Sequence, residues 1–265
     1  MEIVTEIERE RISTLLREGK RIDGRDFDEV RPIQIKQGVI TKAEGSAEAW
    51  LGKSRILAGI KVQVGTPFPD TPDEGVIIAS AELSPMASPI FELGPPGEQA
   101  IELARVVDRG IRHSDVIKRT DLCIKAGEQV YLLMLDLYVL ADHGNLIDAG
   151  SIAAISALLD TSLPKVTVSE EGSVDLDFDN STPLALGPPP LTVTFAKIDD
   201  SIIADPSLEE EQVMDVRLSI AIDGDDTISS MQKYGTSPLS YQEVTDCVER
   251  ASKIVKKMRK QLPKR

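Results

Sequence analysis

The sequence contains few cysteines and no long uninterrupted hydrophobic run. Its two cysteines, Cys123 and Cys247, lie too far apart for a Cys-x-x-Cys pair, so we expect neither a disulfide framework nor a zinc ribbon. A reduced compartment, the cytoplasm, fits this cysteine usage best. Asp136 and Asp142 interrupt the best candidate for a membrane-spanning segment, so we expect no such segment. The first residues are acidic and helical in character, unlike a signal peptide.

Positive charge and aromatic rings are also scarce. The chain has 30 Lys and Arg against 44 Asp and Glu, a net charge of −14. Such a surface repels nucleic acid as a whole, and only a local basic patch could bind it. From charge alone we favour the alternative that the acidity only keeps the protein soluble. Aromatic residues make up 4% of the chain, so any nucleic acid is expected to be held by its backbone rather than by base stacking.

The chain is organised around residues 129–159. Residues 129–141 are apolar on both alternating faces, with Asp136 as the main interruption, which predicts a strand buried on both sides. Residues 146–159 are rich in Ala, Gly and Ser and predict a helix that packs closely on its neighbours, with Asn145 as its N-cap. The turn between them could hold a phosphate on the free N–H groups of the helix. No Arg or Lys stands beside it.

Further patterns predict the remaining elements. A helix over 2–18 has a thin apolar stripe and would pack on a partner or on the domain's own flank. A second helix covers 98–112, and a third begins at a Ser240–Glu243 capping box. The basic end of the third, residues 253–265, could touch RNA, although we favour a solvated helix end. A β-hairpin or meander is predicted over 46–64, and strands are predicted over 31–36, 76–83, 166–168, 174–178, 191–197, 201–204, 213–222 and 227–233.

Two blocks of strands, each followed by helices, predict an α+β fold with mixed sheets and two subdomains. The composition changes over residues 165–190, which contain short strand-like pieces and a proline-rich turn. We therefore expect an N-terminal helix and connector over 1–30, a first domain over 31–165 and a second domain over 191–262.

Several stretches together resemble the RNase PH family, whose members degrade RNA from the 3′ end by phosphorolysis. None is a strong motif alone, but their order and spacing extend over nearly the whole chain. The similarity is greatest to the non-catalytic RNase PH-like subunit of the archaeal exosome, and it implies the RNase PH-like fold (ribosomal protein S5 domain 2-like). The stretches are Arg25-Asp26 with Arg31-Pro32, Gly45-Ser46-Ala47-Glu48, the helix Arg105–Arg112, the strand ending at Ala141-Asp142, and the acidic segment Ala204–Asp215.

The same resemblance implies that the reaction site is degenerate. Phosphorolytic members have a Gly-Thr-Arg-like turn after the core strand, where this chain has Gly144, Asn145 and Leu146. An apolar side chain thus replaces the cation that would grip phosphate. Where the family has two aspartates, this chain has Glu209 and Asp215. The longer Glu moves a carboxylate outward by roughly 1.5 Å, which can cost on the order of 100-fold in rate. We predict no catalytic residues.

The acidic segment has two interpretations. It could be a Mg²⁺ or acid–base site, and Asp205 also matches an acidic position of the family. With the phosphate turn absent, we favour a solvated loop and helix start, and we expect no metal and no cofactor. His143 could be a general base, but a turn histidine that hydrogen-bonds the backbone is preferred. The acidic residues are Asp199, Asp200, Asp205, Glu209, Glu210, Glu211 and Asp215.

Basic residues in and after the helix 98–112 are the candidate RNA-binding residues. RNA phosphates require guanidinium or ammonium groups that converge on one face. The alternative is compensation of the helix dipole with helical pairs such as Glu102–Arg105. The resemblance favours RNA for Arg112 and Arg119, because paired subunits of the exosome ring hold the RNA end between them. The candidates are Arg105, Arg109, Arg112, His113, Lys118 and Arg119.

The resemblance implies a non-catalytic subunit in a complex that degrades RNA from 3′ to 5′. It would alternate with a catalytic RNase PH-like subunit in a hexameric ring of three heterodimers, with RNA-binding cap subunits on one face. It would shape the partner's active site and add positive charge for single-stranded RNA. Two alternatives are a self-sufficient phosphate-dependent exoribonuclease and a scaffold module of related fold that never meets RNA.

Overall fold

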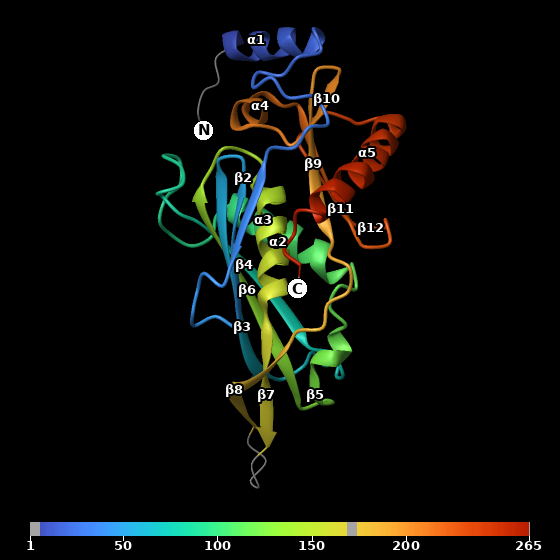
Figure 1. The fold of residues 1–265 in the computed structure, drawn as a ribbon. Helices are drawn as coiled ribbons and strands as arrows, with labels where there is room; N and C mark the ends of the chain where they lie inside the picture. The colour runs from blue at the N-terminus through green and yellow to red at the C-terminus, as the bar shows by residue number, and fades with distance from the viewer. Residues whose placement is uncertain (1–5, 169–173, 265) are drawn as a thin grey trace.

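The computed structural model describes residues 6–168 and 174–264, which form two β-sheets with helices packed between and around them (Figure 1). The first sheet has the strand order β1-β2-β3-β6-β4, with β5 paired to β6. Its strands are β1 (Ile33–Gln37), β2 (Gly45–Leu51), β3 (Ser54–Gly65), β4 (Val76–Leu83), β5 (Cys123–Lys125) and β6 (Gln129–Ala141). The second sheet has the order β10-β9-β11-β12. Its strands are β9 (Leu191–Ile198), β10 (Ser201–Ala204), β11 (Val216–Ile222) and β12 (Ile228–Tyr234).

Two helices occupy the space between the sheets. Helix α3 (Leu146–Asp160) contacts β2 and β3 on one side and β9 on the other, and α2 (Glu98–Arg112) contacts β4, β12 and α3. Strand β4 runs parallel to β6, so the chain between them must cross over, and α2 makes that crossover. Helix α5 (Tyr241–Arg259) packs on β9 and β11, on the side away from α3 (Figure 1).

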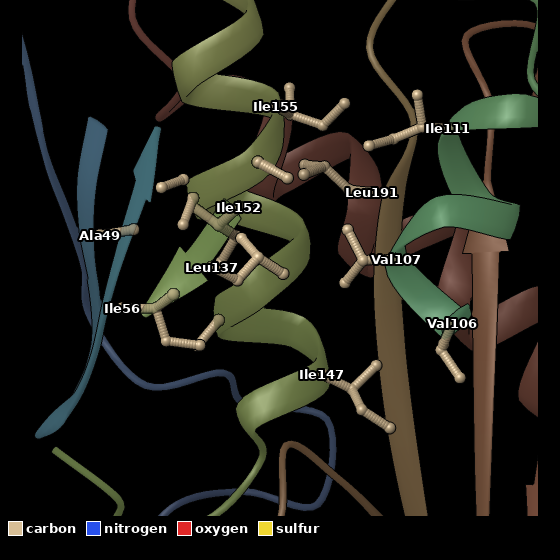
Figure 2. Packing of buried hydrophobic residues seen from close by; sticks show 14 of the residues in the cluster. Ala49, Ile56, Val106, Val107, Ile111, Leu137, Ile147, Ile152, Ile155 and Leu191 are labelled. Carbon is tan, nitrogen blue, oxygen red and sulfur yellow. The ribbon is translucent and has the colours of Figure 1, made fainter. Parts of the chain in front are cut away.

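Helix α3 is buried all round, as its small residues predict. Every residue from Ile147 to Leu158 is buried. A Cβ on Gly150 would lie 3.0 Å from Leu103 Cδ1, so a larger residue would require the Leu103 side chain on α2 to shift. Figure 2 shows the side chains of α3 between Ile56 of the first sheet and Leu191 of the second. One hydrophobic cluster therefore includes residues of both sheets.

The prediction that the core strand is buried on both sides is wrong. In β6, Leu133, Leu135 and Leu137 are buried, whereas Asp136 and Tyr138 on the other face are exposed, Tyr138 by 43%. Helices α2 and α3 cover only the inner face of the six-stranded sheet. The apolar pattern misleads here because apolar residues are also common on protein surfaces.

Helix α1 (Glu6–Arg17) packs on the chain itself, which resolves one alternative left open by the sequence. Ile12 and Leu16 contribute to a second hydrophobic cluster with Ile198 and Ile203. Residues 2–5 of the predicted helix and the C-terminal residue 265 lie outside the described residues. No helix in the described part of the chain has the length and apolar character needed to cross a membrane.

The remaining predicted elements are confirmed with small shifts at their ends, apart from the strand predicted over 213–222. Residues Leu208–Val213 form helix α4, and strand β11 begins only at Val216. Helix α4 begins with a capping box between Ser207 and Glu210, and it extends to Val213, where the predicted strand was expected to begin. The hairpin β7 (Ser162–Val168) and β8 (Val174–Pro183) connects the two parts of the fold, and a short 3-10 helix, Arg119–Leu122, follows α2. The α+β class with mixed sheets is confirmed.

Candidate functional site

The turn after β6 is closed by the chain's own acceptors. Three successive backbone N–H groups point at side-chain oxygens, one of which comes from α4. No successive pair of these donors is left open for a bound anion. The bonds run from His143 N to Ser54 Oγ (3.1 Å), from Gly144 N to Asp142 Oδ1 (3.0 Å) and from Asn145 N to Glu211 Oε1 (2.9 Å).

The backbone of this turn is left-handed at two successive residues. Gly144 has φ +84°, and a Cβ there would lie 2.5 Å from Leu208 N. Asn145 has φ 54°, which asparagine tolerates better than most residues. Its side chain caps α3 by accepting from Asp148 N, so the predicted N-cap is confirmed. The turn thus brings the start of α4 directly against the start of α3.

A cation does reach the turn, but on its carbonyl side. Arg31 donates to His143 O (2.7 Å) and Gly144 O (3.1 Å). The same guanidinium holds Asp205 through Nε (2.9 Å) and Nη2 (2.7 Å). Burial alone would raise the pKa of Asp205, but bonds with Arg31 and the charge of Arg25 hold it below its usual value. The Arg31 guanidinium is therefore occupied by Asp205 and by the carbonyl groups of the turn, and it does not face the N–H groups of residues 143–145.

The acidic segment contains the expected helix start, at α4, but the expectation that the segment is solvated is wrong for its central residues. Asp205 and Glu210 are fully buried. Arg21 donates to Glu210 through Nε (2.9 Å) and Nη2 (2.6 Å), and Arg25 Nη1 donates to Asp205 Oδ2 (2.9 Å). These carboxylates hold the connector 20–31 onto the second sheet. Sequence reasoning missed Arg21 because its partner lies 189 residues away in the chain; three arginines in one short connector were the available signal.

The two acids that replace the family aspartates do not form a site together. Asp215 pairs with Arg9 of α1 (2.6 Å) and accepts from Asp199 N (2.8 Å). Glu209 is exposed to solvent. Within residues 6–168 and 174–264, no three His, Cys, Asp or Glu side chains are grouped so that they could hold a metal ion.

A cavity of about 450 Å³ opens beside the turn, and acids dominate its polar lining. Among the described residues of its lining, Arg217 is the one cation, and it pairs with Glu102 (2.6 Å). Burial raises the pKa of Glu211 to about 7, although the Arg217 charge opposes the shift. Burial also raises the pKa of Asp142. A phosphate would be repelled from this cavity whenever these acids are charged. The acids of the lining are Glu98, Glu102, Asp142 and Glu211.

His143 is exposed, and its bonds to Ser54 and Arg31 use its main-chain N and O atoms. These main-chain bonds place His143 in the turn and do not decide between the two predicted roles of its side chain. The carbonyl of Gly144 also accepts from Ser54 Oγ (2.7 Å). Ser54 thus fixes both sides of the turn, a role that nothing in the sequence indicated.

Arg112 and Arg119 lie together at the beginning of β4. Arg112 Nη2 donates to Ile77 O (2.7 Å), and Arg119 O accepts from Gly75 N (2.8 Å). Arg112 also pairs with Asp108 (2.8 Å), and Arg119 pairs with Glu74 (2.9 Å). Their side chains keep 29% and 33% exposure. Two arginine side chains at one strand end are thus held in place while part of each side chain still faces solvent.

The other candidate RNA-binding residues are divided between one helix face and the following loop. Arg105 and Arg109 share the outer face of α2 with Arg112, because residues four and seven apart lie on one side of a helix. Arg109 donates to Gln232 on β12 (3.3 Å). Arg105, His113 and Lys118 are exposed. The predicted pair Glu102–Arg105 is wrong, since Glu102 pairs with Arg217 of β11 instead.

The basic end of α5 is partly used by the fold. Arg259 donates to Pro189 O and Ile222 O (both 2.9 Å), and Lys256 pairs with Asp226 (2.6 Å). Arg259 is therefore partly buried against the fold, unlike the solvated helix end that the sequence favoured. Lys253, Lys257 and Lys260 remain exposed.

Comparisons with known proteins agree over nearly the full chain. Models of the 3′ exoribonuclease family match in two parts, domain 1 over residues 29–164 and domain 2 over residues 189–254. The protein named Exosome complex component Rrp42 of Thermococcus gammatolerans is 50% identical over 260 residues, 98% of this chain and 95% of that protein. The protein of the same name from Thermococcus kodakarensis is 50% identical over 265 residues, which are 100% of this chain and 97% of that protein.

A solved structure also matches this chain over nearly its full length. A chain of the Archaeoglobus fulgidus exosome, described as having RNA bound to the active site, superimposes with a TM-score of 0.89. It is 42% identical, and the alignment covers 97% of this chain and 98% of that one.

Proposed function

Because this chain belongs to the 3′ exoribonuclease (RNase PH) family, as its sequence resemblance predicted, we propose that it is the non-catalytic RNase PH-like subunit of an archaeal-type exosome. Its relatives from Thermococcus carry the name of an exosome component and share half of their residues with it. In this role the chain contributes to 3′-to-5′ RNA degradation without performing phosphorolysis itself.

The turn at residues 143–145 is the observation that carries this proposal. Phosphorolysis needs an inorganic phosphate held in place as the attacking group, and anion grips of this kind use N–H groups together with a cation. Here the N–H groups of the turn donate to Ser54, Asp142 and Glu211, and Leu146 offers no charge. The cavity beside the turn is acidic.

The proposed contribution to RNA binding lies at Arg112 and Arg119. Both are anchored at the beginning of β4 and keep part of the side chain in solvent. Such groups can neutralise RNA phosphates without reading the base sequence. Arg105, Arg109, His113 and Lys118 extend the same basic region in the proposal.

The proposed assembly is a hexameric ring of three heterodimers, in which this chain alternates with a catalytic RNase PH-like subunit. RNA-binding cap subunits would cover one face of the ring, and the complex would work in the cytoplasm on single-stranded RNA. The chain would shape the active site of its neighbour. The match to a chain of a solved exosome at a TM-score of 0.89 supports this arrangement.

A phosphorolysis assay tests the proposal. The purified chain, its catalytic partner and the reconstituted complex are each incubated with RNA and inorganic phosphate, and released nucleoside diphosphates are measured. We expect no release by this chain alone and release by the complex. Release by this chain alone would instead support the self-sufficient exoribonuclease. A complex whose activity and RNA binding do not depend on this chain would support the scaffold module.

A further inference from the structure

We propose that a groove on the open face of the six-stranded sheet is the surface on which the catalytic subunit docks, and that it receives a segment of that subunit carrying basic and apolar side chains. The inference rests on the proposed function and adds to it the place and the chemistry of the contact between the two subunits.

The groove has a volume of about 860 Å³ and lies between two strands and one loop. Its floor is the exposed face of β4 and β6, where Ser80 pairs with Asp136 and Glu82 pairs with Tyr138 across the two strands. Its wall is the proline-rich segment 90–97, which leads into α2. Helices α2 and α3 lie on the other face of this sheet, so the groove is open to an outside molecule.

The groove is acidic, and no cation of the described chain neutralises it. Four carboxylates line it, and none of the lining residues is Lys, Arg or His. None of the four forms an ion pair with another described residue. Asp136 accepts only from Ser80 Oγ (2.6 Å), and Glu82 accepts from the Tyr138 hydroxyl. Such a surface repels RNA phosphates and attracts the Lys or Arg side chains of a partner. The four carboxylates are those of Glu82, Glu92, Glu98 and Asp136.

Apolar side chains beside these acids offer the rest of the contact. Leu93 is 83% exposed, Ile90 45% and Tyr138 43%, and all three line the groove. Exposed apolar side chains that gather within a polar rim mark sites of contact with other proteins, and tyrosine is enriched in such interfaces. The groove therefore fits a protein segment in which a large apolar side chain is flanked by Lys or Arg.

The position of the groove favours the catalytic subunit as its occupant. Glu98 and Gln99 line the groove from the first turn of α2. Arg105 lies seven residues, about 10 Å, further along the same side of this helix, and it belongs to the basic region proposed to bind RNA. A subunit seated in the groove would thus have its surface next to the part of this chain that is proposed to hold the RNA.

The affinity of the full-length chain for the catalytic subunit, measured by titration calorimetry, tests the inference. Glu92→Lys/Asp136→Lys reverses two charges of the groove. The matched control, Asp225→Lys/Glu249→Lys, makes the same change of net charge at two exposed acids outside the groove. We expect the groove variant to bind the catalytic subunit at least about tenfold more weakly than the unmodified chain, because like charges would then face each other. The control should bind it as the unmodified chain does.

Two milder substitutions protect the test against misfolding. Leu93→Ser changes a side chain that is 83% exposed, so it should leave the fold intact and weaken binding by about tenfold, the scale of one apolar side chain buried at the contact. Ile7→Ser on α1, 77% exposed, is its control and should have no effect. Asp136→Asn keeps an acceptor for Ser80 and removes only the charge, so it should weaken binding less than the charge reversal does.

Equal affinities of the groove variants and their controls for the catalytic subunit would overturn the inference and leave the proposed function standing, because the two subunits would then meet elsewhere. Loss of RNA retention by the complex at unchanged subunit affinity would also overturn it. Self-association of this chain that only the groove variants abolish would assign the groove to a second copy instead. No binding between the unmodified chain and the catalytic subunit would contradict the proposed function as well.

Discussion

Arg21 and Glu210, which lie 189 residues apart in the chain, form an ion pair whose side chains have no exposed surface. The pair fastens the N-terminal connector to α4, and α4 in turn carries Glu211 to the turn after β6. The closed state of that turn therefore depends on a contact between two distant parts of the chain.

Breaking this pair should destabilise the fold strongly. Removal of one partner leaves an uncompensated buried charge, so Arg21→Ala and Glu210→Ala should each lower the free energy of unfolding by about 3–5 kcal/mol. Urea denaturation measures the loss. The exposed pair Arg17–Asp199 is the control, and Arg17→Ala should cost no more than about 1 kcal/mol. Equal small effects at both pairs would show that the buried pair does not hold α4 in place.

Gly144→Ala should destabilise the chain more than Gly24→Ala. Both glycines are left-handed, with φ +84° and +80°, but only Gly144 has backbone atoms within 3 Å of a would-be Cβ. The shared conformational cost is about 1–2 kcal/mol, and the contact with Leu208 adds to it at residue 144. The comparison of the two unfolding free energies isolates the contact. Equal losses of unfolding free energy in the two variants would mean that α4 can move away from the turn at little cost and is not held against it.

The raised pKa values of Asp148 and Glu211 should make stability fall as the pH rises towards neutrality. Burial raises the pKa of Asp148 from 3.8 and that of Glu211 from 4.5, each to about 7. The folded chain therefore binds more protons than the unfolded chain in this window. The stabilisation from the neutral acids is complete below about pH 4 and is lost as the pH passes through about 7.

Denaturant unfolding of the unmodified chain and of Glu211→Gln, at intervals from pH 5 to 8, measures this effect. The variant should gain stability relative to the unmodified chain as the pH rises, because Gln cannot ionise. For Glu209→Gln, a substitution at an exposed position, the free energy of unfolding should change with pH in parallel with that of the unmodified chain. Parallel curves for Glu211→Gln as well would show that Glu211 ionises in the fold as it does in the unfolded chain.

Neutral substitutions of Arg112 and Arg119 should weaken RNA retention by the assembled complex. Each lost phosphate contact should reduce the slope of log affinity against log salt by about one unit. Filter binding over a range of salt concentrations measures both quantities. Lys253→Gln on α5 is the control, since this lysine is exposed and basic but distant in the fold from the start of β4. Unchanged retention in Arg112→Gln and Arg119→Gln would favour a scaffold that never meets RNA.

Local patterns in the sequence predicted much of the fold. The apolar stripe of residues 98–112 defined α2, and the small residues of 146–159 defined α3, because each pattern reflects the contact of one element with its neighbours. The lack of a positive charge at residue 146 could also be read from the sequence, because it depends on the identity of that one residue.

The closure of the site could not be predicted in the same way. The contacts of Glu211 with Asn145 and of Arg21 with Glu210 join parts of the chain that lie far apart in the sequence. A run of acids looks solvated in sequence because its arginine partners are far away along the chain. The open face of β6 was missed for a related reason, since alternation alone does not tell which face a helix will cover.

Phosphate binding by the unmodified chain tests the central claim most directly. Phosphorus NMR of inorganic phosphate, with the chain titrated in at pH 8 and the catalytic partner as the positive control, reports whether the turn at residues 143–145 accepts an anion. We predict no saturable binding to this chain and clear binding to its partner. Saturable one-to-one binding that disappears when Asn145 is replaced would contradict the account.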